Sequence, residues 1–144
     1  MSAQTVQTTM RNLTDEAVIC TLYHQMMAGW NQGNADAFAA PFTEDADFIA
    51  FDGAHFKGNQ EIVQTHQSLF ETHLKGTRLI GHVTSVRFLT ADVALMHAVG
   101  GTVTRGKSAP SSERDSIQTL VATKRGSDWR LAAFHNTSVT AHRP

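Results

Sequence analysis

The sequence predicts an α+β domain in which three helices come before a long, curved antiparallel sheet. Two patterns support this prediction. Apolar residues recur at intervals of three or four as far as His73, and after Gly76 they alternate with polar residues. Helices that come first and long strands that come last are typical of α+β domains. The length of 144 residues suits one domain. We expect it to span residues 14–140, after a polar, frayed segment 1–13.

The first two helices are indicated by their capping residues. Thr14 is the expected N-cap of the first helix, and Gly33 is expected to end it. Asn34 can cap a short helix over residues 35–39, which Pro41 stops. The first helix carries one apolar stripe, which consists of Ile19, Leu22, Tyr23, Met26 and Trp30.

A strand and a short hairpin are expected between the second and third helices. Residues 46–52 form the strand, Asp52 and Gly53 make the turn, and residues 55–57 return. Gly58 then opens the third helix. Its buried stripe is expected to contain Ile62, His66, Leu69, Phe70 and His73.

The second half of the chain predicts four long strands. They are expected over residues 79–89, 93–103, 116–123 and 129–137. The connections are a turn at 90–92, a polar loop at 107–112 and a hairpin turn at 125–128. In the last strand, strict alternation places Ala133 and His135 on one face and Phe134 and Asn136 on the other. Both faces are mostly apolar, so we expect both to be covered.

Composition excludes several classes of function. The net charge of −1 gives no basic surface for nucleic acid or for a membrane, and no apolar run is long enough to span one. We therefore expect a cytoplasmic protein. Cys20 stands alone, and the eight histidines form no HxxxH or HxH pair, so no metal is expected. No glycine-rich phosphate loop follows a strand, so no nucleotide cofactor is expected either.

Several segments of the sequence resemble those of a known superfamily. The run from Trp30 to Asp36, the run from Phe42 to Ala46 and the helix opened by Gly58 resemble the nuclear-transport-factor-2-like superfamily, which includes SnoaL-like polyketide cyclases and ketosteroid isomerase. The resemblance narrows to the SgcJ/EcaC family in these residues: His66, Leu69, Phe70, Leu74–Gly76, Gln118–Val121 and Trp129–Thr137. It implies a cone-shaped α+β barrel with an apolar pocket at its open end, and a homodimer formed through the outer sheet face.

The chemistry of ketosteroid isomerase does not carry over. The position of its catalytic aspartate is Ala50 here, and the position of its first-helix tyrosine is Met26. Asp52 lies two residues further on and faces the same way as Ala50, so it could replace that aspartate. An aspartate at the mouth of a hairpin is also a common turn residue.

His66 is the first candidate for a catalytic residue, with His135 and Asn136 as its partners. A histidine on a buried stripe needs a hydrogen-bond partner, and a side chain at the end of the last strand could supply one. Burial would keep the imidazole neutral, as a general base requires. The alternative is a structural hydrogen bond that ties helix to sheet.

Further residues are candidates for the wall of a ligand site. His97 and Gln118 could each face either the pocket or a dimer interface, and Met26 and Trp30 could instead be ordinary core. The full set is Met26, Trp30, Phe48, Asp52, Phe70, His97 and Gln118.

The sequence thus predicts a small-molecule-binding protein, or an enzyme without cofactor that uses general acid–base chemistry. Its ligand would be apolar, aromatic or polycyclic. The alternative is a non-catalytic module of the same fold that serves only for dimerisation or association, or as a ligand carrier.

Overall fold

The computed structural model describes residues 2–109 and 115–139, and of Thr8 only the backbone. The end of the predicted loop 107–112 and the predicted domain end at residue 140 lie outside these residues. The elements are α1 (Ala3–Asn31), α2 (Ala35–Ala39), β1 (Phe42–Ile49), β2 (His55–Lys57), α3 (Gly58–Glu71), β3 (Arg78–Thr90), β4 (Val93–Val103), β5 (Asp115–Arg125) and β6 (Asp128–Ser138).

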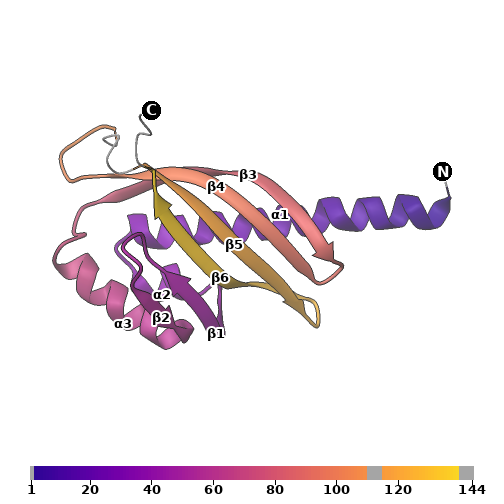
Figure 1. Cartoon of the computed structure of the whole chain (residues 1–144), viewed down its shortest axis with the longest axis horizontal. Coiled ribbons are helices and arrows are strands. Elements are labelled where there is room, and N and C mark those ends of the chain that lie inside the picture. Colours follow the sequence, from indigo (N-terminus) through magenta and orange to yellow (C-terminus); the bar gives the residue numbers. More distant parts are fainter. Residues whose placement is uncertain (1, 110–114, 140–144) are drawn as a thin grey trace, which may run out of the picture.

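One curved sheet of six strands packs on the helices, in the order β2-β1-β6-β5-β4-β3 (Figure 1). The predicted fold class is therefore confirmed: helices come first, and a long sheet bends over them without closing. Neighbouring strands are antiparallel except for β1 and β6, which run parallel. The α1 helix crosses the inner face of the four long strands, and α3 packs on β1 and β2.

The start of α1 differs from the prediction. Thr14 is not the N-cap, because the helix begins at Ala3, where the Ser2 hydroxyl accepts a hydrogen bond from the Thr5 amide. The Thr14 hydroxyl instead donates to the Met10 carbonyl one turn earlier, as a threonine inside a helix does. The first turns of α1 therefore continue as helix beyond the strands, where a frayed segment was expected (Figure 1).

The faces of β6 also differ from the prediction. Val121 of β5 pairs with Ala133, whereas the next residue, Ala122, pairs with Leu131. Ala132 is thus the extra residue of a β-bulge, which reverses the alternation of side chains beyond it. Trp129 and Leu131 point inward, but after the bulge it is Phe134 and Asn136, and not His135, that point inward. His135 therefore does not share a face with Trp129 and Leu131, although strict alternation predicted that it would.

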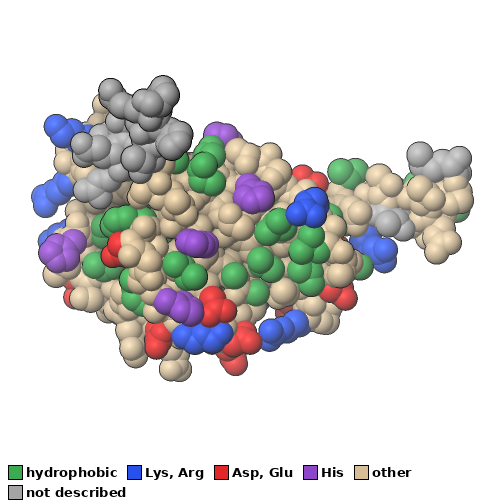
Figure 2. Space-filling model, viewed as in Figure 1, with side chains coloured by type: hydrophobic (Ala, Val, Ile, Leu, Met, Phe, Trp, Pro, Cys, Tyr) green, Lys and Arg blue, Asp and Glu red, His purple; other side chains and the backbone are tan. Residues whose placement is uncertain are grey.

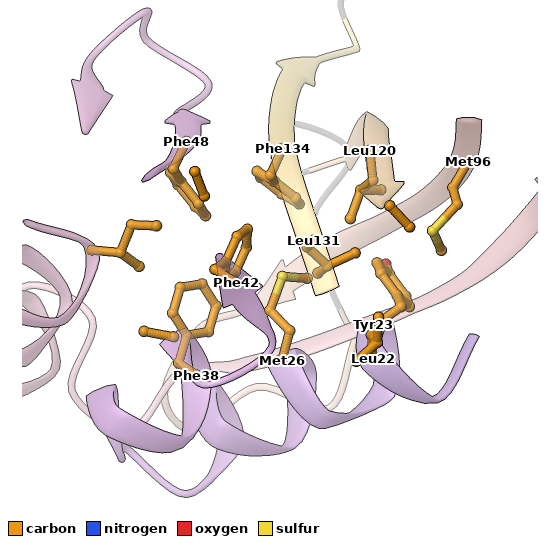
Figure 3. Packing of buried hydrophobic residues seen from close by; sticks show 14 of the residues in the cluster. Leu22, Tyr23, Met26, Phe38, Phe42, Phe48, Met96, Leu120, Leu131 and Phe134 are labelled. Atoms are coloured by element: carbon orange, nitrogen blue, oxygen red, sulfur yellow. The ribbon is translucent and has the colours of Figure 1, made fainter. Parts of the chain in front are cut away.

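The core lies between α1 and the inner sheet face (Figure 3). Side chains from α1, α2, β1, β4, β5 and β6 meet there, and the largest fully buried ones include Tyr23, Phe38, Ile19, Met26, Met96, Leu120 and Leu131. Gly29 permits the closest approach of two helices, because a methyl group there would overlap the backbone of Phe38 in α2.

We expect the substitution Gly29→Ala to lower the free energy of unfolding by about 2 kcal/mol, as overpacking does. The sign of this change in the free energy of unfolding is informative, because alanine is a better helix former than glycine and would otherwise stabilise α1. Urea denaturation measures the effect, with Gln25→Ala on an exposed part of α1 as the control. Equal stability of Gly29→Ala and wild type would show that α2 does not depend on this contact.

Candidate functional site

His66 lies in α3 inside a cluster of aromatic rings. It is 3% exposed. Its ring centroid lies 4.4 Å from that of Phe38 and 5.0 Å from that of Phe48, and three more rings lie within about 6 Å, those of Trp30, Phe56 and Phe70. Such a setting excludes water from most of the imidazole and disfavours its charged form.

The hydrogen bonding of His66 differs from the prediction. Nδ1 lies 2.8 Å from the carbonyl oxygen of Ile62, one turn earlier in the same helix, so it donates to this carbonyl. The partner is therefore not His135 or Asn136. Nε2 makes no hydrogen bond among the described residues, yet it is not one of the fully buried polar atoms without a partner. The nitrogen that carries the lone pair thus keeps contact with solvent.

Burial lowers the pKa of His66 from its ordinary value of 6.5 to about 4, and the Ile62 carbonyl opposes this only in part. The imidazole is therefore neutral at pH 7 and can accept a hydrogen bond at Nε2. A base with so low a pKa takes up a proton weakly, because general bases work best with a pKa near the operating pH.

A second polar group lies on the inner sheet face. Gln118 of β5 is buried, and its Oε1 accepts a hydrogen bond of 2.6 Å from the hydroxyl of Tyr23 in α1. Its Nε2 donates to the hydroxyl of Ser116 at 3.3 Å. Burial raises the pKa of Tyr23 to about 12, so its hydroxyl keeps the proton. Gly81 of β3 makes room for this hydroxyl, because a methyl group there would lie 2.6 Å from it.

Asn136 extends this polar group onto β6. It is the register partner of Gln118, and its Oδ1 is fully buried without a hydrogen-bond partner among the described residues. An acceptor left in this state costs roughly 1 to 3 kcal/mol. We name Tyr23, Ser116, Gln118 and Asn136 the inner polar patch.

The sequence analysis missed Tyr23, which it counted as part of the apolar stripe of the first helix. A signal was present: a tyrosine inside a buried stripe needs a partner for its hydroxyl. What the sequence lacks is the register that brings Gln118 to it. Figure 3 shows the Tyr23 ring rising from α1 toward the strands that carry Met96 and Leu120.

Most predicted wall residues belong to the core. Met26 is 1% exposed, and Phe48 stacks on Phe134 with 4.6 Å between ring centroids. Trp30 packs on Phe70, and its Nε1 donates to the Thr77 hydroxyl at 3.1 Å.

Three predicted residues lie away from His66. His135 is exposed on the outer face of the sheet, and His97 is half-buried on that same face. Thr119 of β5 lies between them, because it is the register partner of both. Asp52 is exposed, and its carboxylate accepts from the Ala54 amide, so it is the turn residue of the hairpin. Of the predicted polar residues, His66 and Asn136 thus lie in the interior, and His97 and His135 lie on the outer face of the sheet.

The surface hollows of the described residues include two of about 260 and 340 Å³. The first is lined by Phe42, Thr43, Glu44, Thr123, Arg125, Asp128 and Arg130, and the second by Gly33–Asp36, Gln67, Phe70 and Glu71. Neither contains His66 or the inner polar patch, so the apolar pocket stays a prediction.

The part of the chain that the structure describes has neither a metal-binding group nor a membrane-spanning helix. Over residues 2–109 and 115–139, no three or more His, Cys, Asp or Glu side chains form a group that could hold a metal ion. In the same part of the chain no helix has both the length and the apolar character to cross a membrane.

Solved structures with the same architecture are numerous. A domain of unknown function with a cystatin-like fold from Nostoc punctiforme is 42% identical, with a TM-score of 0.85, over 89% of this chain and 79% of that one. An NTF2-like protein from Novosphingobium aromaticivorans is 18% identical, with a TM-score of 0.78, over 98% and 92%. A domain assigned as the association domain of a calcium/calmodulin-dependent protein kinase type II, from Thiobacillus denitrificans, is 15% identical, with a TM-score of 0.71, over 83% and 93%.

Comparison with curated proteins found no match. A family model described as a SnoaL-like domain matches residues 11–135, which is most of the chain. This range includes α1 beyond its first turns, all of α2 and α3, and every strand up to His135 in β6. The resemblance to the nuclear-transport-factor-2-like superfamily is thereby confirmed, and the chain belongs to the SnoaL-like domain family.

Proposed function

We propose that this protein binds a mostly apolar, aromatic or polycyclic small molecule between α3 and the inner sheet face. The observation that carries the proposal is the buried Oδ1 of Asn136, which has no hydrogen-bond partner among the described residues. Such atoms also occur on Thr43, Thr123 and Trp129, but Asn136 lies beside Gln118 in the inner polar patch. An unpaired buried polar atom needs an explanation, and a functional site is one explanation. A hydroxyl or N–H group of a ligand would supply the missing donor, beside Gln118 and Tyr23.

His66 would serve this site as a hydrogen-bond acceptor. Its Nδ1–H is fixed on the Ile62 carbonyl, so the lone pair of Nε2 is presented in a constant direction. The rings of Trp30, Phe48 and Phe70 around it suit an aromatic ligand. A pKa of about 4 favours binding over proton abstraction. If the protein is an enzyme, general acid–base chemistry at His66 and Asn136 remains its mechanism, with His135 outside the site.

The second candidate function is a module that only assembles. The close packing of rings around His66 favours it, because a filled interior leaves little space for a ligand. The Thiobacillus denitrificans structure, assigned as an association domain, has the same fold. For this chain we propose a homodimer through the outer sheet face. The apolar residues that support it are half-buried or exposed there: Val93, Leu95, Val99, Ile117 and Val121. We also propose, from the sequence resemblance, that the protein belongs to the narrower SgcJ/EcaC family.

Figure 2 views this outer face. Hydrophobic and histidine side chains lie over the central strands, while the charged side chains lie mostly toward the margins of this face. This arrangement, apolar in the middle and polar at the rim, is common in interfaces between proteins.

The ligand proposal predicts a loss of selectivity in Asn136→Leu. Wild type should bind 2-naphthol about fivefold more tightly than naphthalene, because only 2-naphthol donates to Oδ1, and a charge-free hydrogen bond contributes about 1 kcal/mol. The variant should bind both alike and unfold no more easily than wild type, since it removes an unpaired acceptor. Fluorescence titration and urea denaturation measure these effects.

The matched control is Gln118→Leu. It leaves the Tyr23 hydroxyl without its acceptor, so this variant should lose stability. Equal affinity of wild type for the two probes would contradict the ligand proposal.

A second prediction concerns His66 and pH. Above pH 6.5 neither the folded nor the unfolded chain protonates His66, so the residue adds no pH dependence there. Between about pH 6.5 and 4 only the unfolded chain takes up the proton, so stability falls with falling pH, by about 3 kcal/mol in all. The variant His66→Leu should lack this part of the decline and become relatively more stable as pH falls. Urea denaturation at a series of pH values measures it.

The exposed His73 provides the control, as His73→Leu. An identical pH profile for wild type and His66→Leu would mean that the folded protein protonates His66 readily. His66 would then not be a neutral acceptor, and its role in the ligand proposal would be lost.

The proposed dimer is tested with Leu95→Glu. A carboxylate at the centre of the outer face should halve the mass of the assembly, because a buried unpaired charge is strongly unfavourable. Light scattering at micromolar concentration measures the mass, and Gln64→Glu, at an exposed position of α3 away from the outer sheet face, is the control. A monomeric wild type would exclude the dimer.

A further inference from the structure

The solvent-facing side of α1 carries an apolar stripe that no described part of this chain covers. Its members are Ala3, Val6, Met10, Leu13, Ala17 and Cys20, at alternating intervals of three and four. Val6, Met10 and Leu13 are 40%, 63% and 64% exposed. This stripe lies on the side of the helix opposite to Ile19 and Tyr23, which pack on the sheet. A helix on the surface of a domain normally presents polar residues there.

The position of the stripe makes it more unusual. Residues 3–14 extend beyond the strands as an arm (Figure 1). An isolated helix of this length is marginal in water. The arm is continuous with the body of α1, where Asp15 lies 4.0 Å from the amine of Lys124 and Ile19 is fully buried. It therefore presents its three large apolar side chains as the end of a rigid helix.

We propose that this stripe packs antiparallel against the same stripe of a second copy of this chain, with Leu13 at the two-fold axis. Apolar residues at three-four spacing are the contact surface of paired helices. In this register Met10 lies against the partner subunit's Ala17, and Val6 against the partner subunit's Cys20. Met10 and Val6 thus each meet a small side chain of the body, and the two Leu13 side chains meet each other at the axis.

A second copy fits this surface because the stripe is complementary to itself. The arm of 12 residues is about 18 Å long. With the axis at Leu13, residues 3–12 of one arm lie opposite residues 14–23 of the other helix, whose solvent side is exposed at Thr14, Ala17 and Thr21. A two-fold axis through Leu13 lets each arm cover the body of the other helix, which is an isologous contact.

Charge is compatible with the same arrangement. The positions that flank the stripe are uncharged at Gln7, Thr9 and Thr14. Glu16 is the charged residue of the flank, and in this register it lies beside the partner subunit's Thr9. No like charges are opposed, so two copies can meet without repulsion. This contact is separate from the proposed dimer of outer sheet faces and does not rest on it. With both contacts the protein is larger than a dimer.

The first test uses the cysteine that the chain already contains. In the variant Val6→Cys, oxidised glutathione should join the introduced thiol to Cys20 of the partner subunit, with reduction of the glutathione disulfide to two thiols. Peptide mass mapping of the non-reduced protein identifies the bond. The controls are Arg11→Cys, on another side of the arm, and Val6→Cys combined with Cys20→Ser. Neither should form the cross-link. A bond between the two introduced thiols, or none at all, would overturn the antiparallel register.

The second test separates the two proposed contacts. Leu13→Glu should halve the mass measured by light scattering, both in wild type and in the Leu95→Glu variant, while Arg11→Glu should leave it unchanged. If Leu95→Glu alone has no effect, the sheet dimer fails and the helix contact stands. If Leu13→Glu has no effect in either background, the stripe serves another partner or none, and the proposal is overturned.

Discussion

The packing of α1 across the inner face of the sheet is the interaction on which the rest of the structure depends. The helix contributes Ile19, Tyr23 and Met26 to the core, and the four long strands bend over it. The Tyr23 hydroxyl bonds to Gln118 from the far side of the core, which fixes the position of the helix along the strands. Because that bond is buried, a shift of the helix would leave two polar groups unpaired.

The same constraint explains why polar groups survive in the interior. Gln118 is satisfied from both sides, by Tyr23 and by Ser116, and adds rigidity to the core. Asn136 is its neighbour on the next strand, yet no residue that the structure describes donates to its Oδ1. The contrast between two adjacent amides, one paired and one unpaired, distinguishes a structural group from a candidate ligand contact.

The fold was predictable from the sequence, whereas the site was predictable only in part. Periodicity and capping residues located α2, α3 and the long strands, because each signal is local. Alternation could not place His135, because one extra residue at Ala132 reverses the faces of β6, and alanine gives no sign of a bulge. The partner of His66 was also missed. In a helix, the carbonyl one turn before a histidine is available to accept from the Nδ1–H of that histidine. Only the structure shows that this bond forms at His66.

The two sides of α1 lead to a last point about the helix. A helix that only closed a core would need one apolar stripe, and this one has two, on opposite sides. The inward stripe accounts for its packing on the sheet, but it does not account for Met10 and Leu13, which lie beyond the strands and are the most exposed apolar residues of α1. Their exposure has an energetic cost in water that folding of this chain alone does not remove. The proposed contact with a second copy of this chain would account for these residues, because it would remove them from water.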